Sequence, residues 1–161
     1  MTAVAARPAG RGTREVRSVA MHDPLVRPLL DELSHEYWTR YQRVLSAEEL
    51  RAEMEHYPAQ DFAAPHGALV LVLEDGEPVA GGAFRRRAEP ELGDPARLPR
   101  PAARRADGTP AVRTAELKRI WTYSAHRRRG LARLVLAELE RRAVERGYRR
   151  VYLTTGPRQP E

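Results

Sequence analysis

Hydrophobic and polar positions along the chain follow a helical spacing in two long segments, and a capping pattern marks a third, shorter one. Leucines recur every three to four positions between residues 23 and 43, and an Asp-Pro pair opens that segment. Residues 46 to 56 begin with the Ser-x-x-Glu pattern of a capping box, which predicts a short helix. From 131 to about 146 apolar residues recur every four positions, and Gly147 is a natural stop.

Five other segments have the composition of strands. Residues 67 to 74 are a continuous apolar run, which predicts a strand buried on both faces, and the Asp-Gly pair after it predicts a tight hairpin. Gly81-Gly82 in the returning strand predicts a bulge or a close approach of neighbouring atoms. The expected strands are Glu15–Ala20, Gly67–Glu74, Pro78–Arg86, Glu116–Tyr123 and Arg149–Thr155.

These elements predict an α/β fold of the α+β kind, with a mixed, mostly antiparallel sheet flanked by helices in the order β-α-α-β-β-β-α-β. The length of 161 residues suits a single domain, which we place at 14–161 after a disordered tail, 1–13, rich in Ala, Gly, Pro and Arg. Residues 87–112 hold five prolines and almost no large apolar side chain, so we expect a long flexible loop there.

Charge is concentrated in one part of the chain. The segment 113–150 carries twelve basic and four acidic side chains, whereas the whole chain has a net charge of +6, so the remainder is slightly acidic. The chain has no cysteine, which excludes disulfides, thiolate catalysis and Cys-based zinc sites. Its five histidines have no ligand-like spacing, so we expect no metal.

The basic turn His126–Ala132 connects the expected strand 116–123 to the helix that follows. A helix start presents unpaired backbone N–H groups and partial positive charge. Gly130 allows a ligand to approach the backbone closely, and the three arginines before it add full charge. The turn therefore predicts a pyrophosphate site, although it matches neither GxGxxG nor GxxxxGK[ST].

The pattern Arg127-x-x-Gly130-x-Ala132, set between a strand and a helix, resembles the signature of the GNAT (Gcn5-related N-acetyltransferase) family, and the chain is similar to small bacterial members. The resemblance implies that the signature binds the pyrophosphate of acetyl-CoA and that the strand before it pairs with the pantetheine arm. It also places a glutamate that acts as general base at Glu116. The coenzyme-binding residues it implies are Ile120, Trp121, Thr122, Arg127, Arg128, Arg129, Gly130, Leu131, Ala132 and Gln159.

The resemblance breaks off near the end of the sequence. Members of the family continue past the position of Glu161 with a further helix, which commonly carries a tyrosine that protonates the departing thiolate, and a terminal hairpin. We therefore expect a chain truncated relative to the family, with the strand 149–155 at a sheet edge. An exposed edge favours pairing with another chain, and a homodimer is one way to cover it.

Three functions remain open on the sequence alone. The first is an N-acetyltransferase that moves the acetyl group from acetyl-CoA to a small-molecule or peptide amine by direct transfer. The second is a CoA-binding remnant with little or no catalysis. The third and least favoured is a basic nucleic-acid-binding module, since no nucleic-acid motif accompanies the arginines. Without a secretory signal or a long apolar run, we expect a cytoplasmic location and no membrane partner.

Overall fold

The computed structural model describes residues 12–41, 57–87 and 113–153, together with the single residues Ser46, Glu48, Glu49, Ala52 and Gly108. Within them, five strands form one sheet in the order β1-β2-β3-β4-β5. Three neighbouring pairs are antiparallel, and β5 joins β4 in parallel, so the predicted mixed, mostly antiparallel sheet is confirmed. The strands are β1 (Arg14–Ser18), β2 (Ala68–Glu74), β3 (Glu77–Arg86), β4 (Thr114–Thr122) and β5 (Arg150–Tyr152).

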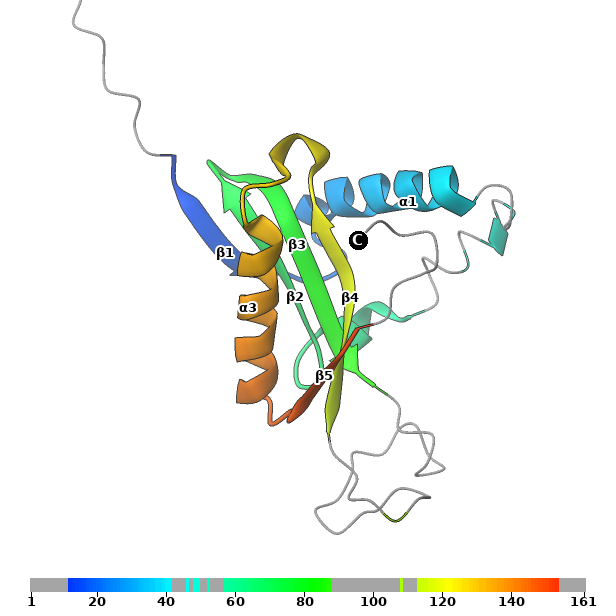
Figure 1. The fold of residues 1–161 in the computed structure, drawn as a ribbon, viewed down its shortest axis with the longest axis vertical. Helices are drawn as coiled ribbons and strands as arrows, with labels where there is room; N and C mark the ends of the chain where they lie inside the picture. Colours follow the sequence, from blue (N-terminus) through cyan, green and yellow to red (C-terminus); the bar gives the residue numbers. More distant parts are fainter. Residues whose placement is uncertain are drawn as a thin grey trace, which may run out of the picture.

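Among the described residues, two helices cover the sheet, one on each face (Figure 1). The helix α1 (Arg27–Tyr41) follows a short 3₁₀ turn, Pro24–Val26, whose start is capped by the Asp23 carboxylate as the Asp-Pro pair predicted. The helix α3 (Leu131–Glu145) connects β4 to β5, which explains why those two strands run parallel.

The expected second helix, 46–56, lies mostly outside the described residues. Its first turn is partly described, and there Ser46 N donates to Glu49 Oε2 at 2.7 Å while Glu49 N donates to Ser46 Oγ at 3.2 Å. These are the two reciprocal bonds of a capping box. The expected tail, 1–13, the expected loop, 87–112, and the end of the expected last strand also fall almost entirely outside the described residues.

The core has two parts, one on each side of the sheet. Alternate residues of β2 supply them, because successive side chains of a strand point to opposite faces. Leu69, Leu71 and Leu73 pack in the cluster under α1, and Val70 and Val72 pack in the cluster under α3. Every one of these side chains is buried, as expected for the continuous apolar run.

The glycine pair of β3 lets both helices approach the sheet. A Cβ on Gly81 would stand 3.0 Å from Leu29 Cδ1 of α1, and a Cβ on Gly82 would stand 2.8 Å from Val135 Cγ1 of α3. The register between β3 and β4 also shifts at this point, between Gly81 and Ala83. The expected close approach is therefore confirmed, and the extra residue of the bulge lies on β4, where Arg119 and Ile120 stand opposite Gly82.

Candidate functional site

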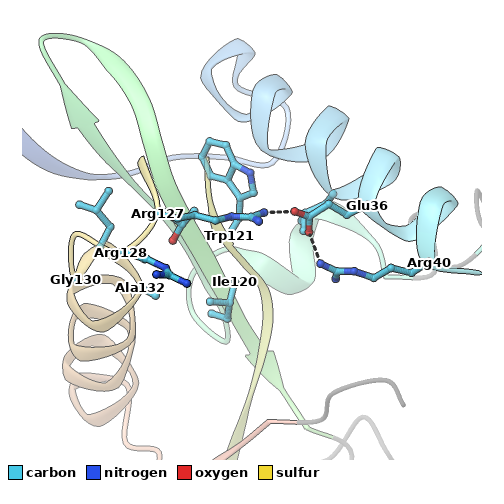
Figure 2. A pocket seen from close by; sticks show the side chains of 11 residues that line it. Glu36, Arg40, Ile120, Trp121, Arg127, Arg128, Gly130 and Ala132 are labelled. Atoms are coloured by element: carbon cyan, nitrogen blue, oxygen red, sulfur yellow. Dashed lines mark hydrogen bonds and ion pairs between the residues drawn. The ribbon is translucent and has the colours of Figure 1, made fainter. Parts of the chain in front are cut away.

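A cavity of about 460 Å³ lies between α1 and the start of α3, beside β4 (Figure 2). Three arginines and one glutamate are among its lining residues, so its charge suits an anion. The turn and the first residues of α3 contribute Arg127, Arg128, Gly130, Leu131 and Ala132; β4 contributes Ile120, Trp121 and Thr122; α1 contributes Leu33, Glu36 and Arg40.

The start of α3 presents backbone N–H groups to this cavity, and within the described part of the chain these groups have no hydrogen-bond acceptor. Gly130 is the N-cap residue, with a φ of +75° that only glycine adopts easily, and it has no side chain to cap the helix. The first intrahelical bond runs from Leu134 N to Gly130 O at 3.1 Å, so the N–H groups of Leu131 and Ala132 precede it. No acidic residue stands in the first turn to balance the helix dipole. An anion in the cavity would satisfy these donors.

The three consecutive arginines of the turn have three different environments. Arg127 pairs with Glu36 of α1 and lies 3.7 Å from Glu32. Arg128, with a φ of +62°, lines the cavity, and among the described residues no carboxylate lies within ion-pair distance of it. Figure 2 shows both Arg127 and Arg128 at the cavity between α3 and β4.

Arg129 lies outside the cavity and fastens the turn to the sheet. Its Nη1 and Nη2 donate to the two carboxylate oxygens of Glu74 on β2, at 2.7 and 2.8 Å. Arg14 of β1 donates to the same carboxylate at 3.0 Å. These hydrogen bonds, with Arg129 contributing most, lower the pKa of Glu74 to about 2. The sequence prediction had placed Arg129 with the coenzyme residues, whereas the structure gives it this structural contact.

Beside the cavity, one edge of β4 has no second strand among the described residues. Within the described residues, β4 pairs with β5 only over Thr114–Glu116, and the residues from Leu117 to Thr122 have β3 as their strand partner. Arg119 has a φ of +58° at the register shift, which marks the bulge in β4. Within the described residues, Ile120, Trp121 and Thr122 therefore have no second strand on the side away from β3, which is the arrangement that an extended ligand needs in order to pair with a strand.

A family model described as Acetyltransferase (GNAT) family matches residues 30–160, which is most of the chain. The chain belongs to the GNAT acetyltransferase family. That assignment confirms the resemblance read from the signature turn. The search of curated proteins found no significant match.

Solved structures of GNAT proteins share this fold at low sequence identity. An aminoglycoside N-acetyltransferase AAC(6')-Iy in complex with CoA is 16% identical, with a TM-score of 0.54, over 94% of this chain and 82% of that one. A predicted acetyltransferase from Clostridium acetobutylicum with acetyl-CoA has a TM-score of 0.61, and a ribosomal-protein-alanine N-acetyltransferase from Brucella melitensis has 0.52. Each of these two is 16% identical, over 90% of this chain and 82% of theirs.

Glu116, the residue that the GNAT resemblance suggests as general base, is not among the residues lining the cavity. It is 8% exposed and pairs through Oε2 with Arg85 at 3.0 Å and through Oε1 with Lys118 at 3.2 Å. Asp61 shares the Arg85 guanidinium at 3.1 Å, and the ring of Tyr57 lies 4.1 Å below it. Glu116 therefore belongs to a charged network on the face of the sheet that α1 covers.

The structure brings together most of the predicted coenzyme residues and adds three from α1. Leu33, Glu36 and Arg40 were not predicted for this site, although their spacing of three and four residues puts them on one face of a helix. That spacing was the available signal in the sequence, but it does not indicate which other element this face of the helix packs against. Gln159 lies outside the described residues.

Within the described ranges, no helix has the length and apolar character required to cross a bilayer. The same part of the chain holds no group of three or more metal-binding side chains gathered together.

Proposed function

We propose that this GNAT protein transfers the acetyl group of acetyl-CoA to a primary amine. The observation that carries the proposal is the start of α3, where uncapped backbone N–H groups face the same cavity as Arg128. Among the described residues, no carboxylate lies within ion-pair distance of Arg128. A diphosphate carries the charge and the acceptor oxygens that satisfy both kinds of donor. Of the predicted coenzyme residues, Gly130, Leu131 and Ala132 would give main-chain contacts there, with Arg127 and Arg128 adding charge.

The rest of the coenzyme would extend along β4. Within the described residues, Ile120, Trp121 and Thr122 have no second strand on the side away from β3, and they line the same cavity as the signature turn. A pantetheine arm has amide groups that pair with such an edge as an added strand would. This placement carries the thioester along β4 and away from the diphosphate.

The reaction needs a neutral amine and a polarised thioester. The amine nitrogen forms the new C–N bond, the C–S bond breaks, the amine proton goes to a base, and the thiolate takes up a proton. We assign the base to Glu116, reached through a water molecule, because it is the buried carboxylate on the face of β4 that α1 covers. The chain has no cysteine, so transfer is direct and passes through no acyl-cysteine.

The acceptor is an amine of a small molecule or a peptide. Two of the fold relatives, an aminoglycoside acetyltransferase and a ribosomal-protein-alanine acetyltransferase, take their names from acceptors of these two kinds.

Calorimetric titration with CoA tests the binding half of the proposal. Arg128→Gln should weaken CoA binding about ten-fold, since a charged hydrogen bond to phosphate is lost. Arg133→Gln is the matched control, because Arg133 is exposed on the first turn of α3 and does not line the cavity. Equal losses in both variants would mean that net charge alone attracts the ligand.

A thiol-release assay with acetyl-CoA and a panel of primary amines tests the catalytic half. Release that depends on the amine supports the transferase. CoA binding without release by any amine would instead identify a CoA-binding protein without catalysis. Duplex DNA that competes with CoA at equal charge would favour the nucleic-acid alternative.

A further inference from the structure

One ion pair connects the two walls of the cavity. Arg127 comes from the signature turn and pairs with Glu36 of α1, as the dashed line in Figure 2 shows. Glu32, one turn earlier on α1, lies 3.7 Å from the same guanidinium and also accepts a hydrogen bond from Ser124 N at 2.9 Å. The side chain of Arg127 is half exposed, whereas those of the two glutamates are largely buried.

This pair conflicts with the role assigned to Arg127. A guanidinium presents its donors in one planar fork, and a carboxylate that occupies the fork excludes a phosphate from it. Glu36 lines the cavity together with Arg127, so its carboxylate stands where a diphosphate would need that arginine. Coenzyme binding through Arg127 therefore requires that the contact with Glu36 be given up.

The structure provides Glu36 with a second partner. Arg40, one turn further along α1, lies 3.5 Å from Glu36 Oε2 and lines the same cavity. After Arg127 turns away, the Glu36 carboxylate still has this guanidinium beside it. The exchange thus leaves no isolated charge in the partly buried wall, which would be costly.

We propose that Glu36 is an internal competitor for Arg127 and that coenzyme binding exchanges Glu36 for the diphosphate. This inference rests on the proposed function, and it makes Glu36 a specificity-determining residue. A diphosphate carries more charge than one carboxylate and displaces it, whereas a singly charged anion gains too little from Arg127 to do so. Glu36 lowers the affinity of the cavity for every anion, so that singly charged anions no longer bind appreciably.

The test is a calorimetric comparison of CoA binding to the full chain and its variants. Glu36→Gln should bind CoA about three- to five-fold more tightly, because an ion pair of this exposure is worth up to about 1 kcal/mol. Glu36→Asp should change affinity in the same direction, since its shorter side chain withdraws from Arg127 and keeps the charge. Glu140→Gln, on the exposed face of α3, changes the net charge equally and should leave the affinity unchanged.

A double-mutant cycle separates competition from a general charge effect. In an Arg127→Gln background, Glu36→Gln should no longer improve CoA binding, because the contested partner is gone. An improvement of equal size with and without Arg127, or a Glu36→Gln affinity no better than that of Glu140→Gln, would overturn the inference. Absence of CoA binding by the unmodified chain would instead overturn the proposed function. Far-UV circular dichroism and thermal unfolding show whether each variant is folded. If Glu36→Gln does not fold, the CoA affinity of Glu36→Asp tests the inference in its place.

Discussion

Gly82 of β3 lies directly against Ile120 of β4: a Cβ on Gly82 would stand 2.7 Å from Ile120 Cδ1. The same Cβ would lie 3.1 Å from Leu139 Cδ1, so α3 packs here on bare backbone. Gly82→Ala must therefore displace Ile120, which lines the cavity, or α3, which begins beside it. We expect unfolding free energy to fall by roughly 1–3 kcal/mol and CoA binding to weaken, measured by denaturant unfolding and calorimetry.

Gly76→Ala is the control for this substitution. Gly76 lies in the exposed hairpin turn with a φ of +83°, and nothing stands within 4 Å of an added Cβ. Backbone strain alone should cost about 1 kcal/mol, and CoA affinity should stay the same. If both variants lose CoA affinity in proportion to their stability, Ile120 has no special part in the cavity.

Gly130→Ala should damage stability and coenzyme binding together. The φ of +75° at Gly130 is strained for any residue with a Cβ, which costs about 1 kcal/mol, and relief of that strain moves the first amides of α3. Gly147, with a φ of +83° at the other end of α3, gives a comparison variant with similar backbone strain, although there an added Cβ would also displace the flexible Arg113 guanidinium, whose Nη1 would lie 2.8 Å away. Thermal unfolding should show a loss for both alanine variants, and calorimetry a weaker CoA affinity for Gly130→Ala alone. Similar CoA affinities for the two would contradict the role of this helix start.

Glu116→Gln should lower the turnover number by about 10²- to 10⁴-fold while leaving CoA affinity unchanged, because the variant keeps the shape but cannot accept a proton. Steady-state kinetics and a CoA titration measure the two effects separately.

Asp61→Asn controls for the charged network around Glu116. The substitution removes the negative charge of Asp61, whose Oδ2 lies 3.1 Å from Arg85 Nη2, and leaves Glu116 unchanged. A general base predicts a large rate loss in Glu116→Gln and a small one in Asp61→Asn. Comparable losses in both, accompanied by comparable losses of stability, would assign Glu116 to structure.

Glu74 should make stability depend on pH in acid. Its folded pKa, about 2, lies below the ordinary value of 4.5, so its ion pairs stabilise the fold above that ordinary value and the stabilisation is lost as pH falls toward 2. Glu74→Gln should lower the unfolding free energy by roughly 1 kcal/mol at pH 7 and by progressively less between pH 4.5 and 2. Denaturant unfolding across this range measures the difference. If the difference in unfolding free energy between the unmodified chain and Glu74→Gln did not shrink as the pH falls, the ionisation of Glu74 would not be the cause of that difference.

Most of the described fold could be predicted from local patterns. The apolar run of β2, the capping signals before α1 and the four-residue period of α3 each specify an element without reference to the rest of the chain. The exact ends could not be predicted: the expected strand from Glu116 begins two residues earlier, at Thr114, where it pairs with β5. Pairing between strands far apart in the chain decides such boundaries, and a local pattern does not record it.

The lining of the candidate cavity could be predicted where one continuous segment builds it, and could not be predicted where two segments meet. Arg127, Gly130 and Ala132 lie in one short motif, and the structure brings them to one cavity. Glu36 and Arg40 lie some ninety residues earlier, and only the packing of α1 over the end of β4 brings them to the same place. Arg129 shows that a place in the motif does not guarantee a place in the cavity. Its sequence neighbour Arg128 lines the cavity, but Arg129 pairs with Glu74 of β2.

The two helices lie on opposite faces of the sheet, each above its own part of the core, and the cavity lies where α1 and the start of α3 come within reach of one another. A molecule seated there would contact both layers at once. Local unfolding of α1 would then require release of that molecule, so the backbone amides of α1 should exchange hydrogen more slowly when it is bound. Ligand binding in the cavity would thus stabilise the packing of α1 against the rest of the protein, and loss of that packing would weaken ligand binding.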